Sequence, residues 1–254
     1  MSRAYLLAGN WKLHHAPNEA QALAQSLRDG AQHRGTVELL VFPTALSIPG
    51  VVQTLEHSEI GVGVQEVETR KEGAFTGSNS AMHARAAGCT HALVGHSERR
   101  QIYGDTDDQV HERLVQSLDA GLLPVLCVGE TLSERESNQA EAVITRQLNA
   151  TLGKVPVDRW SGITVAYEPV WAIGTGVTAT PAQAQQIHAF IRSWIADHSS
   201  ALSDEMRILY GGSVKPGNAQ ELLVCPDIDG ALIGGASLEA HSFLGILRAA
   251  QSLA

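Results

Sequence analysis

Residues 162–176 read GITVAYEPVWAIGTG, a strand-like run followed by a charged residue, a proline and a glycine-rich turn. Glu168 stands at the carboxyl end of the predicted strand, where a parallel sheet presents its functional groups. Pro169 stiffens the backbone directly after it. The apolar residues 170–173 and the glycines that follow could form a mobile lid beside a carboxylate, with a water-excluding underside. An ordinary strand–helix connection with a buried aromatic side chain is the alternative, and this stretch alone leaves both open.

Seven other runs resemble this strand. The eight predicted strands span residues 4–10, 37–43, 60–65, 91–95, 123–128, 162–168, 207–211 and 229–234. Their interiors are rich in Val, Leu, Ile and Ala with little alternation, which is typical of strands buried on both faces of a parallel sheet. The third is the least clear, because glycines interrupt it.

Helical periodicity separates these strands. One apolar stripe has the spacing i, i+3, i+4 and i+7 expected of a helix face; its members are Ala20, Leu23, Ala24 and Leu27. A similar stripe comprises Val110, Leu114, Val115 and Leu118. Thr180 followed by Pro181 predicts the start of another helix, with threonine as the cap and proline in the first turn.

Eight strand–helix units in 254 residues leave about 32 residues per unit, the size of a βα repeat with short loops. No linker or shift in composition divides the chain. We therefore predict an α/β fold in which residues 1–254 form a single domain, an eight-stranded parallel (β/α)8 barrel. A doubly wound open sheet is the alternative, but it often has a glycine-rich turn after its first strand. Here residues 9–12 read GNWK, without a GxGxxG motif.

Composition restricts the class of protein. A content of 44% hydrophobic and 18% charged residues is typical of soluble globular proteins. The formal net charge of −9 argues against binding nucleic acid or an anionic membrane, although a small anionic substrate is compatible with it. We expect no signal peptide and no membrane span. The cysteines, Cys89, Cys127 and Cys225, lack the spacing of a zinc site or a disulfide framework, which favours a reducing cytoplasm.

Polar residues follow the carboxyl ends of several predicted strands, where a barrel carries its catalytic groups. In strand order they are Asn10 and Lys12, His96, Glu168, residues 211–213 and residues 234–237. The last two groups are glycine-rich turns that open onto helices, where backbone N–H groups and the helix dipole can bind phosphate. Two such turns after the seventh and eighth strands predict a phosphate site, although tight turns without a function remain the alternative.

His96 directly precedes a predicted helix, whose N-terminus disfavours the charged imidazolium. We therefore expect a neutral imidazole that can donate a hydrogen bond to a carbonyl. A base such as Glu168, a neutral donor and a fixed cation such as Lys12 around a phosphate site are the groups that proton abstraction beside a carbonyl requires.

Other candidates for chemistry are weaker. The adjacent His14 and His15 cannot share a helix face as metal ligands do, so a solvated loop is favoured. Cys127 lies within an apolar run and is expected to be a core residue rather than a nucleophile. Residues 105–108, Asp-Thr-Asp-Asp, fit an acidic helix N-terminus better than a metal site.

Several motifs together resemble the triosephosphate isomerase family. They are residues 9–12 (GNWK), 73–77 (GAFTG), 94–100 (VGHSERR), 127–130 (CVGE), 166–176 (AYEPVWAIGTG), 210–213 (YGGS) and 234–237 (GGAS). They follow the family's order and spacing from Gly9 to Ser237. The resemblance implies a TIM barrel that interconverts dihydroxyacetone phosphate and D-glyceraldehyde 3-phosphate through an enediolate, a step of glycolysis and gluconeogenesis.

The resemblance also implies a role for each site residue. Glu168 would be the base, neutral His96 would polarise the carbonyl, Lys12 would stabilise developing negative charge, and Asn10 would help to hold the substrate. The backbone amides of four residues would bind the phosphate: Gly174, Ser213, Gly234 and Gly235. No metal and no organic cofactor is implied. The lid interpretation of residues 170–176 is strengthened, because Gly174 would couple phosphate binding to closure.

Members of the family are typically homodimers in which a projecting loop carrying Thr76 enters the partner subunit. The corresponding loop, residues 66–79, departs from the family's pattern at Glu66 and at Ser78-Asn79, which bears on the dimer contact and not on the chemistry. Val177 is a further departure, at the second hinge of the expected lid. Two other functions for a phosphate-binding barrel are a Schiff-base aldolase that uses Lys12 and a non-catalytic phosphate-binding protein.

Overall fold

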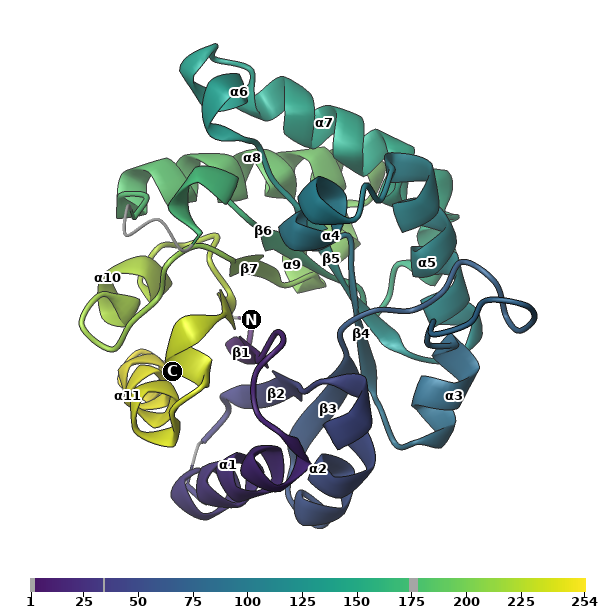
Figure 1. Ribbon diagram of the computed structural model, residues 1–254. Coiled ribbons are helices and arrows are strands. Elements are labelled where there is room, and N and C mark those ends of the chain that lie inside the picture. The colour runs from purple at the N-terminus through teal and green to yellow at the C-terminus, as the bar shows by residue number, and fades with distance from the viewer. Residues whose placement is uncertain (1–2, 34, 174–177) are drawn as a thin grey trace.

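The computed structural model describes residues 3–33, 35–173 and 178–254, and in these residues eight parallel strands close into a barrel ringed by helices (Figure 1). The strands are β1 (Leu6–Asn10), β2 (Glu38–Phe42), β3 (Ile60–Val64), β4 (His91–Val94), β5 (Leu123–Val128), β6 (Thr164–Tyr167), β7 (Ile208–Tyr210) and β8 (Gly230–Ile233). The helices are α1 (Pro17–Gly30), α2 (Ile48–Thr54), α3 (Ala81–Ala86), α4 (Ser97–Ile102), α5 (Asp107–Asp119), α6 (Leu132–Glu136), α7 (Ala140–Ala150), α8 (Pro181–His198), α9 (Ser200–Glu205), α10 (Ala219–Leu223) and α11 (Ala240–Gln251). Each strand pairs with the next in sequence and β8 pairs with β1. The predicted barrel is confirmed, and the open doubly wound sheet is wrong.

The third strand shows why glycines interrupt an otherwise apolar run. β3 contains Gly63, and a Cβ added there would overlap the ring of Phe42 on the neighbouring strand β2. The glycine is therefore needed for close packing inside the barrel, and the weak strand signal reflects that requirement.

Two apolar layers hold the barrel together. Inward-facing side chains fill its interior: Leu6, Ala8, Leu40, Phe42, Leu93, Val125, Cys127, Ala166, Leu209 and Leu232. The outward-facing side chains pack against the helices, and the buried residues of α1 are the predicted stripe of Ala20, Leu23, Ala24 and Leu27. Residues buried on both faces explain the near-continuous apolar runs of the strands.

The predicted helix start at Thr180 is confirmed by its capping contacts. The Thr180 hydroxyl accepts a hydrogen bond from the Gln183 backbone N–H, and the Gln183 side chain accepts one from the Thr180 N–H. Thr106 caps α5 in the same manner, with Asp107 and Asp108 in its first turn. The acidic helix N-terminus predicted for residues 105–108 is therefore confirmed, and it complements the helix dipole.

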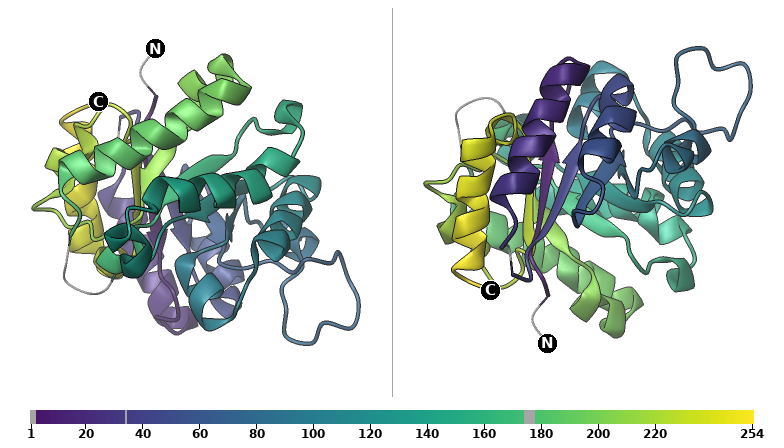
Figure 2. Two further views of the ribbon diagram at one scale, coloured as in Figure 1. Left: turned by 90° about the horizontal axis from the view of Figure 1, so that it is seen from above. Right: turned by 90° about the horizontal axis from the view of Figure 1, so that it is seen from below.

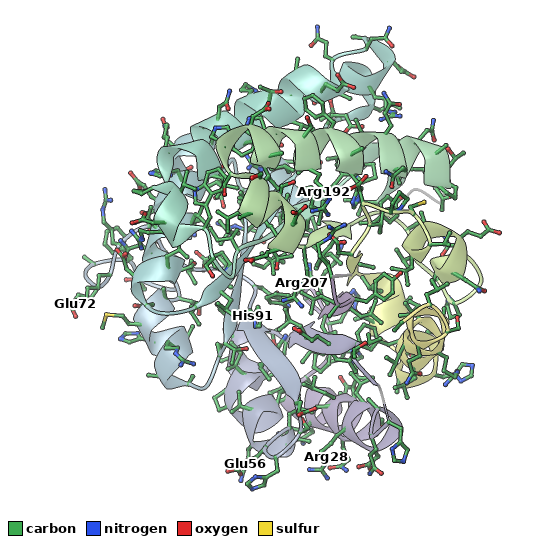
Figure 3. The ribbon with its side chains drawn as sticks, turned by 180° about the vertical axis from the view of Figure 1, so that it is seen from behind. Arg28, Glu56, Glu72, His91, Arg192 and Arg207 are labelled. Atoms are coloured by element: carbon green, nitrogen blue, oxygen red, sulfur yellow. The ribbon has the colours of Figure 1, made fainter. Side chains whose placement is uncertain are left out.

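Charged side chains from several elements meet near the amino-terminal ends of the strands. Figure 3 shows His91 of β4, Arg207 before β7 and Arg192 of α8 at this end of the barrel. Arg207 forms an ion pair of 2.7 Å with Glu38. The pKa of His91 is lowered to about 4, first by burial and then by the charge of Arg207, while Glu38 acts in the opposite direction.

Because of the lowered pKa of His91, we expect the free energy of unfolding to decrease in acid. The unfolded chain protonates His91 near pH 6.5 but the folded chain only near pH 4, so the unfolded state binds the extra proton as the pH falls between these values. The contribution is fully present above about pH 6.5 and amounts to about 3 kcal/mol, lost by about pH 4. Urea unfolding of the wild type and of His91→Asn at several pH values measures it. Parallel pH profiles for the two proteins would contradict the prediction.

Candidate active site

A cavity of about 530 Å³ opens at the carboxyl ends of the strands. Of the residues predicted for the site, those that line it are Asn10, Lys12, His96, Glu168, Ser213, Gly234 and Gly235. Gly174 lies outside the described residues. The strand-end rule thus gathers side chains that are distant in sequence around one space.

His96 is positioned by the start of α4, for which it is the N-cap. Its Nδ1 accepts a hydrogen bond of 3.2 Å from the backbone N–H of Glu98. A ring nitrogen that accepts cannot carry the proton, so the neutral ring with its proton on Nε2 fits this contact. Nε2 lies 3.0 Å from Oε1 of Glu168, and the two groups expected to handle protons are direct neighbours.

Glu168 is only 2% exposed, and its carboxylate is held by the start of α4. Ser97 donates its backbone N–H to Oε2 at 2.8 Å, and its hydroxyl lies 3.4 Å from Oε1. The backbone of Glu168 is wedged between two glycines. A Cβ added at Gly129 would overlap the Glu168 carbonyl, and one added at Gly211 would lie 2.8 Å from Glu168 Cγ. Both glycines therefore serve close approach to the proposed base.

This wedge predicts the effect of Gly211→Ala. The new methyl group would lie 2.8 Å from Glu168 Cγ and 3.0 Å from the Tyr167 carbonyl oxygen, so the carboxylate must shift. A displacement approaching 1 Å in a positioned group can cost about 100-fold in rate, and we expect kcat to fall by about 10- to 100-fold. Gly217→Ala is the control, because a Cβ there would meet no atom within 4 Å. Steady-state kinetics of both variants measure the difference; equal kcat values would contradict the prediction.

Lys12 occupies a strained turn after β1. Its φ is +50°, a left-handed conformation that costs a lysine about 1–3 kcal/mol. The Asn10 side chain accepts the Lys12 N–H at 3.0 Å, and the Gln65 side chain donates to the Lys12 carbonyl at 2.8 Å. The ammonium forms an ion pair of 2.5 Å with Glu98, and its Cε is 3.3 Å from the Cβ position of Gly234. The turn thus directs the ammonium into the cavity beside the glycine-rich turn after β8.

The two glycine-rich turns are held by side-chain hydrogen bonds. Asn218 donates to the Ser213 carbonyl at 3.0 Å, and the Ser237 hydroxyl donates to the Gly234 carbonyl at 2.7 Å. A Cβ placed at Gly235 would meet no atom within 4 Å, so open space adjoins this backbone. Fixed amides beside open space and a lysine suit an anionic group.

The stretch beyond Glu168 is anchored by Glu130, which lies two residues after the end of β5. The fully buried Glu130 accepts hydrogen bonds from Tyr167 Oη at 3.0 Å and from Trp171 Nε1 at 2.9 Å. Arg135 pairs with the same carboxylate at 3.2 Å. Ile173 lines the cavity, and residues 174–177, including Val177, lie outside the described residues. The first part of the expected lid is therefore fastened through Trp171.

The weaker candidates occupy different environments. Cys127 is fully buried inside the barrel, and burial raises the pKa of its thiol well above the usual value, with the Glu168 carboxylate raising it further. Such a thiol is a poor nucleophile. His14 is exposed and lines the cavity, whereas His15 packs edge-on against Trp11. Among the residues that the structure describes, no three His, Cys, Asp or Glu side chains are grouped to bind a metal ion.

Sequence reasoning missed several residues of the site. Glu98 pairs with Lys12, Ser97 holds Glu168, and Gln147 of α7 contacts Gly129. Glu98 and Ser97 lie within the VGHSERR motif, and their position directly after His96 was the available signal. Gln147 offered no such signal, since it sits within an otherwise ordinary helical stretch.

Comparisons with known proteins agree with this geometry. The family model described as triosephosphate isomerase matches residues 5–250. The curated proteins named triosephosphate isomerase include one from Dechloromonas aromatica that is 49% identical, covering 98% of this chain and 99% of the relative. Another, from Hydrogenovibrio crunogenus, is 46% identical with 98% of each chain covered. A third, from Rhodopirellula baltica, is 43% identical over 99% of this chain and 100% of the relative.

The match thus spans nearly the whole barrel and includes every strand end that lines the cavity. The geometry of the site agrees with the similarity of the chain. The chain belongs to the triosephosphate isomerase family.

Proposed function

We propose that this protein is an isomerase that interconverts dihydroxyacetone phosphate and D-glyceraldehyde 3-phosphate, a step of glycolysis and gluconeogenesis. The observation that carries this conclusion is the 3.0 Å contact between Glu168 and His96 in a cavity that Lys12 also lines. A carboxylate base next to a neutral hydrogen-bond donor and a fixed cation can move a proton between two carbons through an enediolate.

The proposed roles follow from the contacts. Glu168 removes the proton from the carbon beside the carbonyl and returns it to the neighbouring carbon. His96 donates from Nε2 to the carbonyl oxygen, because its Nδ1 is occupied by the Glu98 N–H. Lys12 stabilises the negative charge of the enediolate, and Asn10 supports the Lys12 turn beside the substrate.

The phosphate is proposed to bind at the glycine-rich turns, through the backbone amides of Ser213, Gly234 and Gly235, with Gly174 contributing from the lid. The nearby Lys12 ammonium adds positive charge to this end of the cavity. Binding through Gly174 would favour lid closure and protect the enediolate from water. We expect the reaction to need neither metal nor organic cofactor, since the three side chains suffice for proton transfer.

A coupled assay with purified protein tests the function. Isomerisation should proceed without added nucleotide and should be unchanged by a metal chelator. Folded protein without turnover at micromolar concentration would contradict the proposal and favour a non-catalytic phosphate-binding barrel. Borohydride trapping of a covalent adduct on Lys12 in the presence of substrate would instead indicate a Schiff-base aldolase.

We further propose a homodimer in which the loop around Thr76 enters the partner subunit. Figure 2 shows the segment between β3 and α3 projecting from the barrel. Phe75 is exposed on this segment, and further large apolar side chains are exposed on the segments that follow β1 to β4: Leu13, Leu46, Met82, Ile102 and Tyr103. Their concentration in the first four strand–helix units, which include the projecting segment, supports a second copy as their cover.

The loop's departures from the family pattern compensate for each other. Glu66 accepts a hydrogen bond from Asn79 at 3.0 Å and pairs with Arg113, which also donates to the Val67 carbonyl. The base of the loop is therefore tied together within one chain. Light scattering at several concentrations measures the assembly, and a monomer at micromolar concentration would contradict the dimer.

A cytoplasmic location is proposed from the chemistry of the cysteines. Cys89 and Cys127 are buried free thiols, and Cys225 is a partly buried free thiol. Free thiols suit a reducing compartment. None of the described helices combines the length and apolar character needed to cross a membrane.

A further inference from the structure

Gln147 is a polar residue on the apolar face of α7. The other buried residues of this helix are Val143, Ile144 and Leu148, and Gln147 itself is only 4% exposed. Burying a side-chain amide is unfavourable unless its donor and its acceptor are both paired. Both are paired here, and with a single residue: Gln147 Oε1 accepts the Gly129 N–H at 2.8 Å, and Gln147 Nε2 donates to the Gly129 carbonyl at 3.0 Å.

Gly129 lies one residue beyond the end of β5, so regular strand pairing no longer supplies hydrogen-bond partners for its backbone. Gln147 takes the place of a neighbouring strand, because it offers one acceptor and one donor at the spacing of a backbone peptide. The position and the orientation of the Gly129 backbone are therefore set from α7, on the outside of the barrel.

The Gly129 backbone is in turn the surface against which Glu168 rests. A Cβ at Gly129 would overlap the Glu168 carbonyl oxygen, so the two backbones are in close contact. The flanking residues continue this contact on both sides. The Glu168 N–H donates to the Val128 carbonyl at 2.8 Å, and the Val170 N–H donates to the Glu130 carbonyl at 3.1 Å.

We propose that Gln147 is a positioning residue for the isomerase reaction, which sets the backbone of the base Glu168 by holding both polar groups of Gly129. Gln147 does not line the substrate cavity, and the hydrogen bonds of its side chain to the described part of the chain both go to Gly129. Its loss should therefore change the rate of proton transfer and leave substrate binding nearly intact. This inference rests on the proposed role of Glu168.

The first test replaces Gln147 by methionine, which preserves the length of the side chain but removes the donor and the acceptor. We expect kcat to fall by about tenfold or more, the scale of a misplaced catalytic group, with KM changed by less than about twofold. Gln220→Met is the matched control, because Gln220 is exposed on α10. A folded Gln147→Met variant with the kcat of the wild type would overturn the proposal.

The second test, Gln147→Glu, has a signature that a merely structural role does not produce, and it decides the matter if the methionine variant does not fold. A protonated carboxyl can still donate to the Gly129 carbonyl and accept its N–H, whereas the ionised form cannot donate. Burial raises the pKa of such a carboxyl, in documented cases to about 8–9. Relative to the wild type at each pH, kcat of this variant should therefore be close to normal at about pH 6 and fall as the pH approaches 9.

Gln220→Glu controls for the added charge and should keep a constant ratio to the wild type. A constant ratio for Gln147→Glu as well would overturn the inference. The proposed function fails separately: if Glu168 is not the base, Glu168→Gln retains turnover, whatever the behaviour of the Gln147 variants.

Discussion

Glu168→Gln is expected to lower kcat by at least about 100-fold, because the amide cannot accept the proton that the carboxylate is proposed to remove. The substitution preserves the shape of a side chain that is only 2% exposed, and the amide oxygen can still accept the Ser97 N–H. KM and the inhibition constant of inorganic phosphate should change little, since the phosphate is proposed to bind at the turns after β7 and β8.

The measurement is steady-state kinetics in both directions of the reaction, together with the inhibition constant of phosphate. Glu221→Gln is the control, because Glu221 is exposed on α10. Turnover within about tenfold of the wild type would contradict the assignment of Glu168 as the base. Loss of phosphate inhibition together with turnover would indicate a disrupted site rather than a missing base.

The barrel, and the functional groups at the ends of its strands, could be predicted from the sequence because both follow from the geometry of parallel strands. Strands buried on both faces need continuous apolar residues, and the carboxyl ends of parallel strands meet on one face, so Lys12, His96 and Glu168 could be placed together from order alone. The predicted bounds of the fifth strand agree with β5, whereas the other seven predicted strands extend one or two residues too far at one end or both, where the backbone leaves the ladder. Gly162 was predicted as strand, but it has a φ of +83° and precedes β6.

Contacts between distant segments could not be predicted in the same way. The pairing of Lys12 with Glu98 and of Gln147 with Gly129 depends on where α4 and α7 pack, which no local spacing encodes. The same limit applies to Glu66 and Asn79. The structure shows that these two departures from the family's pattern are hydrogen-bonded to each other, a contact that their positions in the sequence do not reveal.

The second large effect is expected at the opposite end of the barrel, where Arg192 joins α8 to the segments that precede β7 and β8 (Figure 3). Its guanidinium pairs with Asp227 at 2.7 Å and with Asp229 at 2.5 Å, and it also donates to the carbonyls of Ser203 and Met206. The side chain of Arg192 is 12% exposed and that of Asp229 is 5% exposed. Among the described residues, removing Arg192 leaves Asp227 without its ion-pair partner and two backbone carbonyls without their donor, whereas Asp229 keeps its ion pair of 2.6 Å with Arg3. Breaking a buried pair in this way typically costs about 3–5 kcal/mol.

Arg192→Met should therefore lower the free energy of unfolding by about 3–5 kcal/mol, whereas Arg159→Met should lower it by less than about 1 kcal/mol. Arg159 forms an equally short ion pair, 2.6 Å to Asp119, but the two side chains are 37% and 54% exposed. Urea unfolding at one fixed protein concentration compares the variants without interference from assembly. Similar losses would mean that burial does not govern these pairs. Because the network lies away from Glu168 and His96, kcat of the folded Arg192→Met variant should stay near that of the wild type. Such a result would show that the Arg192 network contributes to the stability of the barrel and not to catalysis.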